Sequence, residues 1–158
     1  MTIYAEHLLH GTSTFEPVPP DEAEMGQRMA ALVEAGYPYF VAERDRHVVG
    51  FGFAAPHRQQ PAFRNTVEDS IYLARDARGQ GIGGALLRAL IEECSARGFR
   101  QMVAVIGGPD DVASVRLHRA AGFLEVGTLQ DIGFRSGWFS AVVMQRPLGM
   151  GGTSAPNR

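Results

Sequence analysis

The sequence predicts a single α/β domain, because segments of two-residue hydrophobic alternation are interleaved with segments of helical spacing. The chain has 158 residues, of which 45% are hydrophobic, and this suits one domain with a sizeable core. A glycine-rich segment, Arg78 to Gly84, lies between a strand pattern and a helical pattern. We therefore assign residues 1–148 to one domain and residues 149–158 to a flexible C-terminal tail.

The first part of the chain predicts two helices followed by a hairpin. A short helix is expected near the N-terminus, where four residues have helical spacing: Ile3, Tyr4, His7 and Leu8. Asp21 and Glu24 have the spacing of a capping box, which predicts a second helix running to about Gly36. The buried stripe of that helix is expected to be Met25, Met29, Leu32 and Val33. Two strands, over residues 37–43 and 47–53, then flank a turn at Asp45-Arg46.

The second part continues with alternating strands and helices. Residues 66–73 alternate as a strand, and the helix after the glycine-rich segment runs from Ile82 to Gly98. Cys94 lies on the apolar side of that helix and is expected in the core. Further strands are expected over residues 101–106, 123–129 and 138–145, with a helix over 112–121. Trp138 is expected to be a buried aromatic of the last strand, with a pocket or a subunit contact as alternatives.

Composition narrows the possible partners and compartments. The net charge of −2 and the scattered basic residues argue against a nucleic-acid surface, so no nucleic-acid partner is expected. Because Cys94 is the only cysteine, neither an intrachain disulfide nor a cysteine zinc site can form, and a reducing cytoplasm is favoured. No metal is expected. The sequence contains no apolar run long enough to span a bilayer and no secretion signal, so no membrane partner is expected.

The glycine-rich segment predicts a phosphate site, because glycines permit close approach and a helix N-terminus attracts anions. Gly79, Gly81 and Gly84 satisfy the dinucleotide fingerprint, but residues 74–78 separate them from the strand, and the acidic residue expected about 20 positions on is missing. A P-loop fails because Ala85 and Leu86 replace its Lys and Ser/Thr. A nicotinamide oxidoreductase is therefore poorly supported.

The arrangement Arg78-x-x-Gly81-x-Gly83 before a helix, followed by Leu117-His118-x-x-x-Gly122-Phe123, resembles the GNAT superfamily of N-acetyltransferases. Within it, the chain is most similar to phosphinothricin and methionine sulfoximine acetyltransferases. The segments that carry this likeness cover nearly the whole chain: residues 11–15, 35–38, 63–68, 101–107 and 144–148.

The resemblance implies a GNAT-type twisted mixed β-sheet flanked by helices on both faces, and a homodimer. The chain begins within what resembles the first helix of the family, so either its start is misplaced or the N-terminal edge strand is missing. Residues 134–140 lack a basic and an acidic side chain that the family usually carries, so a different substrate pocket is expected.

The resemblance also implies that acetyl-CoA is the cosubstrate. Its diphosphate is expected on Arg78 and on the backbone of Gly79, Gln80, Gly81, Ile82, Gly83 and Gly84. Its pantetheine arm is expected along the backbone of Ile71, Tyr72 and Leu73. Asp111 replaces the Asn that usually contacts the cofactor in this family, although a helix N-cap is the simpler interpretation, and Ser114 is a further candidate contact.

Transfer of acetyl from a thioester requires a neutral amine, and an α-amino group titrates near ~7.7–8.0, so a base assists the reaction. Glu68 is the expected base, acting directly or through a water, and a backbone N–H near Ile71 is expected to stabilise the oxyanion. His118 occupies the position of the Tyr acid found in many superfamily members, and packing is its alternative role. Direct attack in a ternary complex is expected, without an acetylated Cys94.

The amino group of a small molecule is the expected acceptor, with methionine sulfoximine, methionine sulfone and phosphinothricin foremost. The positions matching or neighbouring those that hold the amino acid in the family are Arg58, Arg64, Thr66, Asp69 and Ser70. The alternative function is a catalytically weak or silent acyl-CoA-binding module, suggested by Asp111 and by the altered residues 134–140.

Overall fold

The computed structural model describes residues 2–10, 18–107, 111–134 and 137–156. Over these residues the helices are α1 (Thr2–His10), α2 (Glu22–Glu34), α3 (Ile82–Ala96) and α4 (Val112–Ala120), with short 3₁₀ turns η1 (Pro61–Phe63) and η2 (Arg75–Ala77). The strands are β1 (Tyr39–Arg44), β2 (His47–Pro56), β3 (Thr66–Leu73), β4 (Gln101–Gly107), β5 (Leu124–Phe134) and β6 (Trp138–Pro147). Every element expected from the sequence is present, with ends shifted by a few residues.

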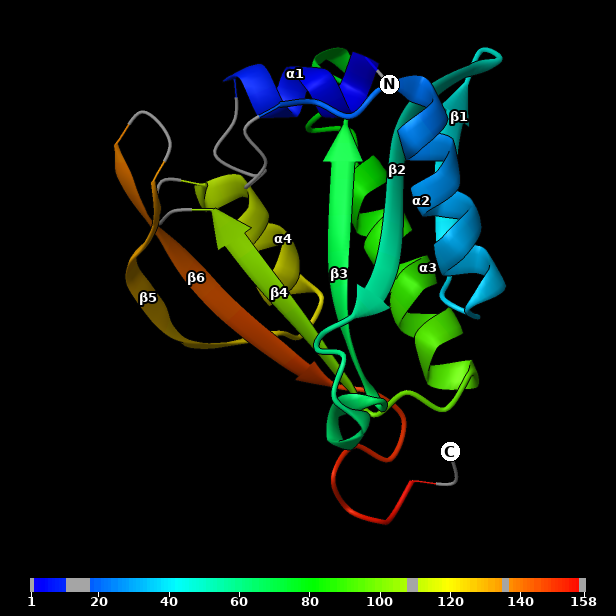
Figure 1. Cartoon of the computed structure of the whole chain (residues 1–158), viewed down its shortest axis with the longest axis vertical. Helices are drawn as coiled ribbons and strands as arrows, with labels where there is room; N and C mark the ends of the chain where they lie inside the picture. Colours follow the sequence, from blue (N-terminus) through cyan, green and yellow to red (C-terminus); the bar gives the residue numbers. More distant parts are fainter. Residues whose placement is uncertain (1, 11–17, 108–110, 135–136, 157–158) are drawn as a thin grey trace.

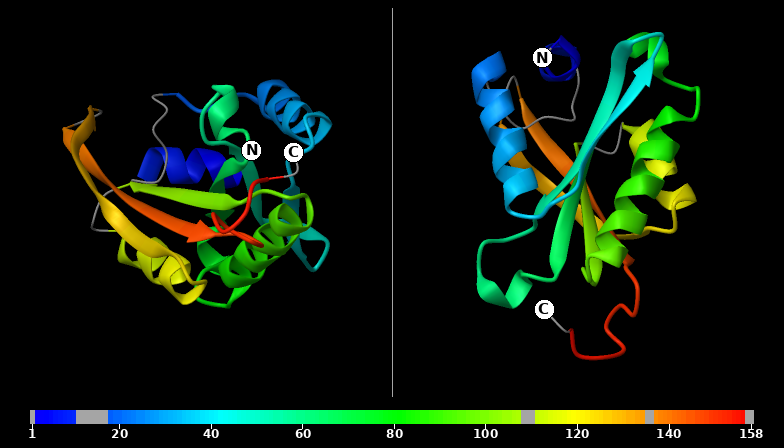
Figure 2. Two further views of the ribbon diagram at one scale, coloured as in Figure 1. Left: turned by 90° about the horizontal axis from the view of Figure 1, so that it is seen from below. Right: turned by 90° about the vertical axis from the view of Figure 1, so that its right-hand side faces the viewer.

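The strands form one mixed sheet in the order β1-β2-β3-β4-β6-β5 (Figure 1). β3 and β4 pair in parallel, whereas the other neighbouring strands are antiparallel. Helices α1 and α2 lie on one face and α3 and α4 on the other, as the right-hand view of Figure 2 makes clear. The expected mixed sheet with helices on both faces is therefore confirmed, and β1 and β5 are its edge strands within the described residues.

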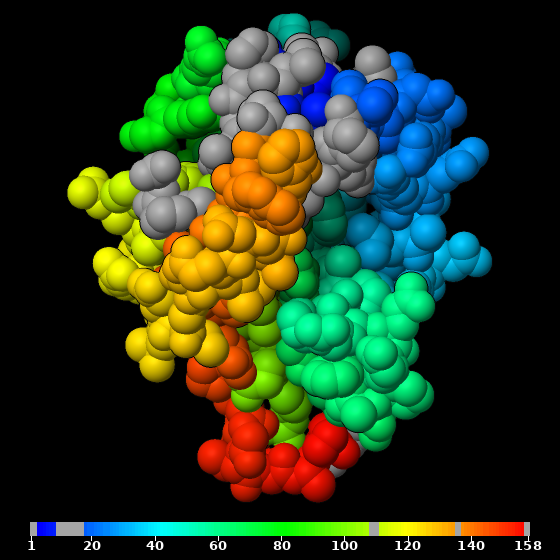
Figure 3. All heavy atoms as spheres, turned by 60° about the vertical axis from the view of Figure 1, so that its left-hand side comes forward, coloured from blue at the N-terminus to red at the C-terminus, as the bar shows by residue number. Residues whose placement is uncertain are grey.

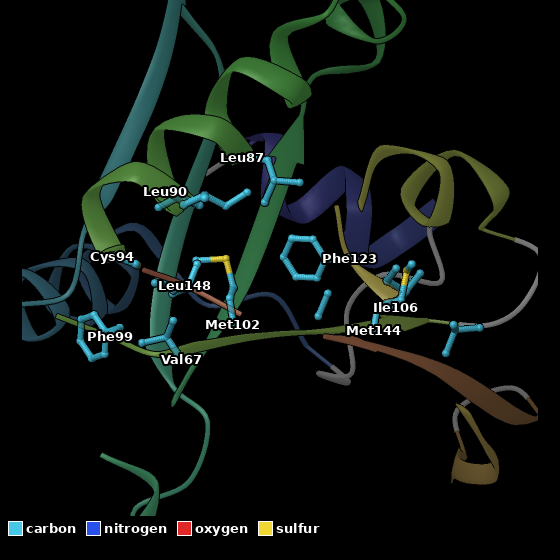
Figure 4. Packing of buried hydrophobic residues seen from close by; sticks show 14 residues of the cluster. Val67, Leu87, Leu90, Cys94, Phe99, Met102, Ile106, Phe123, Met144 and Leu148 are labelled. Carbon is cyan, nitrogen blue, oxygen red and sulfur yellow. The ribbon is translucent and has the colours of Figure 1, made fainter. Parts of the chain in front are cut away.

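The main core lies between the sheet and α3 (Figure 4). Leu87, Leu90 and Cys94 of α3 are fully buried against Met102 of β4 and Met144 of β6. Each large aliphatic side chain buried in this way contributes about 1.5–3 kcal/mol relative to an exposed one. Cys94 therefore belongs to the core, as expected. This burial raises the pKa of its thiol to about 12.

A smaller cluster covers the opposite face of the sheet, below α1. Tyr4 and Leu8 of α1 pack with Phe51 of β2 and Tyr72 of β3. The rings of Tyr4 and Tyr72 meet edge to face, with centroids 5.0 Å apart. Because strand side chains alternate between faces, Tyr72 marks the α1 face and Val67 the α3 face of β3.

Local signals in the sequence are found in their expected places. The Asp21 carboxylate accepts a hydrogen bond from the Glu24 backbone N–H at 2.8 Å and caps α2. Asp45 and Arg46, at the hairpin turn, have φ values of 50° and 64°, which is the left-handed conformation that two-residue turns between strands prefer.

Two expectations about burial are wrong. Helix α2 contains no buried residue, and Met29 and Val33 of its expected stripe are 42% and 55% exposed, because α2 touches the sheet chiefly at its edge strand β1. Trp138 is 67% exposed, because it pairs with Phe134 where the β5–β6 hairpin extends beyond the core. The start of β6 is thus on the surface.

The chain beyond β6 folds back against the end of the sheet. Leu148 is 1% exposed and belongs to the main core. The Arg100 guanidinium donates to the Ser154 hydroxyl at 2.8 Å and to the Ala155 carbonyl at 3.0 Å. Across the described ranges, no helix has the length and apolar content that crossing a membrane requires.

Candidate active site

The site begins where β3 and β4 separate. These strands pair only from Thr66 with Gln101 to Glu68 with Val103, and beyond that point they diverge (Figure 1). Residues 69–72 of β3 and 104–107 of β4 line a pocket in the gap, together with Asp111, Ser114 and His118. The polar backbone edge of β3 therefore faces a space in which an extended ligand can pair with it like an added strand.

The glycine-rich loop lies at the end of β3 and leads directly into α3. Gly79 and Gly81 have φ values of 73° and 81°, in the left-handed region, and a Cβ at either position would meet nothing within 4 Å. Gly81 precedes the first turn of α3 and provides no side-chain cap. The first N–H groups of a 15-residue helix are thus available to an anion, as a diphosphate requires.

Gly83 serves packing as well as ligand approach. It is buried, and a Cβ there would lie 3.3 Å from Leu73 Cδ1 and 3.5 Å from Leu117 Cδ2. A Cβ on Gly84 would lie 3.4 Å from the guanidinium of Arg88. Gly79 and Gly81 therefore allow the left-handed backbone of the loop, whereas Gly83 and Gly84 allow neighbouring side chains to pack closely.

A polar network from the hairpin braces the loop. The Gln80 amide nitrogen donates to the Asp76 carbonyl at 2.7 Å, and its oxygen accepts from Arg44 at 2.8 Å. Arg44 also pairs with the Asp76 carboxylate at 3.1 Å. The Gln80 side chain is thus occupied within the protein, and the backbone of this residue remains its route to a ligand.

Arg78 is exposed and lies beside His7 of α1. Its guanidinium is 3.2 Å from Nε2 of His7, and the same ring nitrogen is 2.9 Å from the Leu73 carbonyl and 3.3 Å from the Leu73 nitrogen. The His7 ring also packs edge-on against Tyr72, with centroids 5.4 Å apart. His7 therefore covers the backbone at the end of β3, immediately next to the expected phosphate site.

Glu68 lies on the α1 face of β3, at the point where the strands separate. Its carboxylate is 3.1 Å from Nδ1 of His57, which follows β2, and the two side chains are 34% and 23% exposed. The backbone N–H of His57 donates to the Thr66 carbonyl at 3.3 Å. A carboxylate that is partly exposed and close to the gap is suitably placed to accept a proton from a bound amine.

His118 and Asp69 lie on the opposite face of β3 and form a buried pair. Nε2 of His118 is 2.9 Å from the Asp69 carboxylate, and Nδ1 is 2.8 Å from the Ser114 carbonyl. The ring packs edge-to-face on Phe123 at 5.0 Å. Burial of His118 lowers its pKa, but the hydrogen bond and charge of Asp69 outweigh this, so the pKa is raised overall.

Asp69, which was expected to be a substrate residue, lies on the face of β3 opposite Glu68. Its side chain is 1% exposed and is bound to His118, whereas Glu68 and Ser70 point to the other face of the strand. Asp111 caps α4, because its carboxylate accepts from the Ser114 N–H at 3.1 Å. Asp111 and Ser114 nevertheless line the pocket, where a cofactor contact was expected.

The remaining expected substrate residues gather around the start of β3. Arg58 and Arg64 are exposed on either side of η1, and Thr66 is half-buried. The Arg58 guanidinium lies 5.9 Å from the Phe63 ring centre, and Arg64 donates to the Pro61 carbonyl at 3.3 Å. Ser70 lies further along β3 and lines the pocket.

Sequence reasoning did not identify His57 or His7 as site residues. His57 stands in a polar loop next to Arg58, and His7 is part of the apolar stripe of α1, so neither has a distinctive motif. Their contacts depend on strand register and on the placement of α1, which only the fold supplies. In the described part of the chain, no group of three or more His, Cys, Asp or Glu side chains is arranged to hold a metal ion.

A glycine-rich loop at a helix N-terminus, an open strand edge beside it, and a carboxylate and an imidazole at the gap match the arrangement that a coenzyme-A-dependent acyltransferase requires. The residues fit such a donor, since the left-handed glycines leave the cradle open and the Asp69 Oδ1 is buried without a partner in the described structure. The chain belongs to the acetyltransferase (GNAT) family, whose sequence profile matches residues 4–123.

Comparisons with individual proteins agree with this assignment. The chain is 47% identical over 155 residues to the phosphinothricin N-acetyltransferase of Alcaligenes faecalis, covering 98% of this chain and 79% of that protein. It is 35% identical over 147 residues to the L-methionine sulfoximine/L-methionine sulfone acetyltransferase of Pseudomonas aeruginosa, covering 92% and 85%.

A crystal structure of a GNAT superfamily phosphinothricin acetyltransferase from Sinorhizobium meliloti, in complex with AcCoA, has a TM-score of 0.95 to this structure. It is 48% identical in sequence, with 99% of this chain and 85% of that chain covered. The protein is therefore an N-acetyltransferase whose acyl donor is acetyl-CoA. The nicotinamide alternative is excluded by this family membership.

Proposed function

We propose that this enzyme transfers acetyl from acetyl-CoA to the amino group of an amino acid or analogue, with methionine sulfoximine, methionine sulfone and phosphinothricin as the first candidates. The observation that carries the proposal is the position of Glu68, a partly exposed carboxylate at the point where β3 and β4 separate. Relatives named for phosphinothricin and for methionine sulfoximine or sulfone support this acceptor class.

Glu68 takes the proton that the amine loses as it attacks the thioester carbonyl, directly or through one water. A backbone N–H near Ile71, on the unpaired edge of β3, donates to the oxyanion. His118 donates a proton to the departing sulfur. Transfer occurs in a ternary complex, because the one cysteine is buried and its pKa of about 12 keeps it a neutral thiol.

The residues that hold the donor are divided between the loop and the gap. Arg78 and the backbone of residues 79–84 hold the diphosphate, and residues 71–73 pair with the pantetheine arm. The half-buried Asp111 and Ser114, at the start of α4, border the arm from the other side of the pocket. His7 must move from the Leu73 backbone for that edge to be fully used, because its Nε2 lies within hydrogen-bond distance of both polar groups of the Leu73 backbone.

The amino acid is held near the start of β3. Arg64 and Arg58 supply guanidinium groups for a carboxylate or phosphinate, and Thr66 and Ser70 supply hydroxyls. All four lie on the β3 segment that carries Glu68 or on the loop before it. The acceptor amine is thereby directed toward the Glu68 carboxylate.

A thiol-release assay over a panel of amino acids and amines tests the proposal. Methionine sulfoximine, methionine sulfone and phosphinothricin are expected to be turned over at least tenfold faster than unmodified polyamines or aminoglycosides. Mass spectrometry should find the acetyl group on the α-amino nitrogen. Turnover confined to amines without a neighbouring carboxylate would overturn the assigned acceptor class.

A second candidate is a weak or silent acyl-CoA-binding module. Asp111 favours it, because this position adds a negative charge to the border of the pocket. Calorimetry with acetyl-CoA, run beside the thiol-release assay, separates the two functions. Binding without turnover of any panel member would support the module, and turnover would exclude it.

We propose that the enzyme is a cytoplasmic homodimer. Its subunits contact each other through β5 and the start of β6. In Figure 3 these strands (yellow to orange) lie on the surface of one side of the molecule. Their exposed apolar side chains are Leu124, Val126, Leu129, Ile132, Phe134 and Trp138. Light scattering should find a dimer that Trp138→Glu dissociates, whereas a monomeric wild-type protein would contradict it.

A further inference from the structure

Both ring nitrogens of His118 face hydrogen-bond acceptors. Nδ1 is 2.8 Å from the Ser114 carbonyl, and Nε2 is 2.9 Å from the Oδ2 of Asp69. A neutral imidazole has a single N–H and can donate to only one of these oxygens, whereas an imidazolium donates to both. The contacts of His118 therefore match the charged ring, with its charge balanced by the carboxylate.

The His118–Asp69 pair is almost fully buried in the described structure. The His118 and Asp69 side chains are 5% and 1% exposed. The other titratable groups near the pair are Asp111 at the start of α4, which also favours the charged ring, and the neutral thiol of Cys94 on α3. Asp69 is thus the direct counter-ion of His118, and removing its charge would leave the imidazolium buried and unbalanced.

Asp69 also has unused hydrogen-bonding capacity. Its Oδ1 is buried and has no hydrogen-bond partner among the described residues. A buried acceptor without a partner destabilises the folded state unless a ligand or a water donates a hydrogen bond to it. Asp69 and His118 both line the pocket between β3 and β4. The pair is therefore part of the wall of the acetyl-transfer site and is not confined to the hydrophobic core.

We propose that Asp69 is a positioning residue, which fixes the orientation of His118 and keeps its ring doubly protonated beside the pocket. The chemical use of this proton rests on the proposed function. When the C–S bond breaks, its electron pair goes to sulfur, and sulfur takes one proton from the imidazolium. The neutral ring then regains a proton from solvent, which receives the one that Glu68 removed from the amine.

Nitrogen NMR of the five histidines tests the protonation state without any turnover. The His118 signals are assigned by their loss in His118→Gln. In the wild type, both ring nitrogens of His118 are expected to be protonated at pH 7, and Asp69→Asn should lower the titration midpoint by at least one pH unit. A neutral His118 ring in the wild type at pH 7, or an unchanged midpoint in Asp69→Asn, overturns the proposal.

The pH dependence of turnover tests the catalytic consequence. Asp69→Asn should lower kcat at least tenfold at pH 8, move the alkaline limb of the profile to lower pH, and leave KM for acetyl-CoA within threefold. The matched control is Asp45→Asn, at an exposed aspartate in the β1–β2 hairpin turn, and it should match the wild type. A lower kcat with an unmoved profile would indicate a merely structural role and contradict the proposal.

The two proposals can fail separately. If no amine is turned over, the proposed function fails, while the NMR result still decides whether Asp69 keeps His118 charged. If Asp69→Asn does not fold, the wild-type ring nitrogens at pH 7 remain decisive.

Discussion

The carboxylate of Glu68 lies 3.1 Å from Nδ1 of His57, and this contact joins β3 to the loop that follows β2. The loop also carries Arg58, so the expected base and an expected substrate residue are tied to one segment. His57 is therefore expected to hold the Glu68 carboxylate in the orientation that an incoming amine requires.

Glu68→Gln should lower kcat about 100-fold, because glutamine keeps the shape and the His57 contact but cannot accept a proton. KM for acetyl-CoA should change little, since the donor site lies elsewhere. The matched control is Glu43→Gln, at an exposed glutamate on the edge strand β1. Steady-state thiol release measures both variants, and an unchanged rate in Glu68→Gln would remove Glu68 from the mechanism.

Gly81→Ala should weaken acetyl-CoA binding about 5- to 30-fold. Gly81 has a φ of 81°, and forcing an L-residue into that conformation costs roughly 1–2 kcal/mol, which the loop would relieve by leaving the cradle geometry. Space is not the cause, because a Cβ would meet nothing within 4 Å. Calorimetry should find normal affinity in Gly127→Ala, another uncrowded glycine, and equal affinities in the two variants would contradict this account.

The order of elements could be predicted because the signals are local. The strand over Thr66–Leu73 has a clear two-residue alternation, and its bounds match the sequence prediction. The loop before α3 could be predicted equally well, because its glycines indicate a loop in the sequence itself. The predicted burial of Met29 and Val33 was wrong. These residues have helical spacing, but α2 lies over the edge of the sheet and has little to pack against.

The candidate site could be predicted only in part. Glu68 and His118 were found through a resemblance, but the partner of each could not be, because His57 is 11 residues from Glu68 and Asp69 is 49 residues from His118. Those pairs depend on the register of β2 against β3 and on how α4 packs. Likewise, the alternation of β3 placed Asp69 on the face opposite Glu68, but the helix that covers it was not evident.

Cys94→Ala should retain turnover within twofold, because the thiol is internal and takes no part in transfer. The variant should lose about 1–2 kcal/mol of unfolding free energy from the cavity that it creates. In the native wild type, with the pKa of Cys94 raised to about 12 by burial, Ellman's reagent should find no reactive thiol, and one should appear after denaturation. Isolation of an enzyme acetylated on Cys94 would establish a ping-pong route instead.

The titration of His7 should contribute to the pH dependence of the unfolding free energy. Burial lowers the pKa of His7 below its usual 6.5, and the charge of Arg78 adds to this effect. The unfolded chain therefore binds more protons at this position than the folded one, so the stabilisation is present above pH 6.5 and is lost as the pH falls through the folded pKa. His7→Gln should remove that part of the acid sensitivity, flattening the fall in unfolding free energy below about pH 6.5.

Urea unfolding at several pH values, followed by circular dichroism, measures this effect. His47→Gln is the control, because His47 is exposed at the hairpin and its loss should leave the pH slope unchanged. Saturating acetyl-CoA should reduce the difference between His7→Gln and the wild type, since the donor competes with His7 for the Leu73 backbone. A steeper acid decline in His7→Gln than in the wild type would show that the protonated ring is the form that the fold prefers.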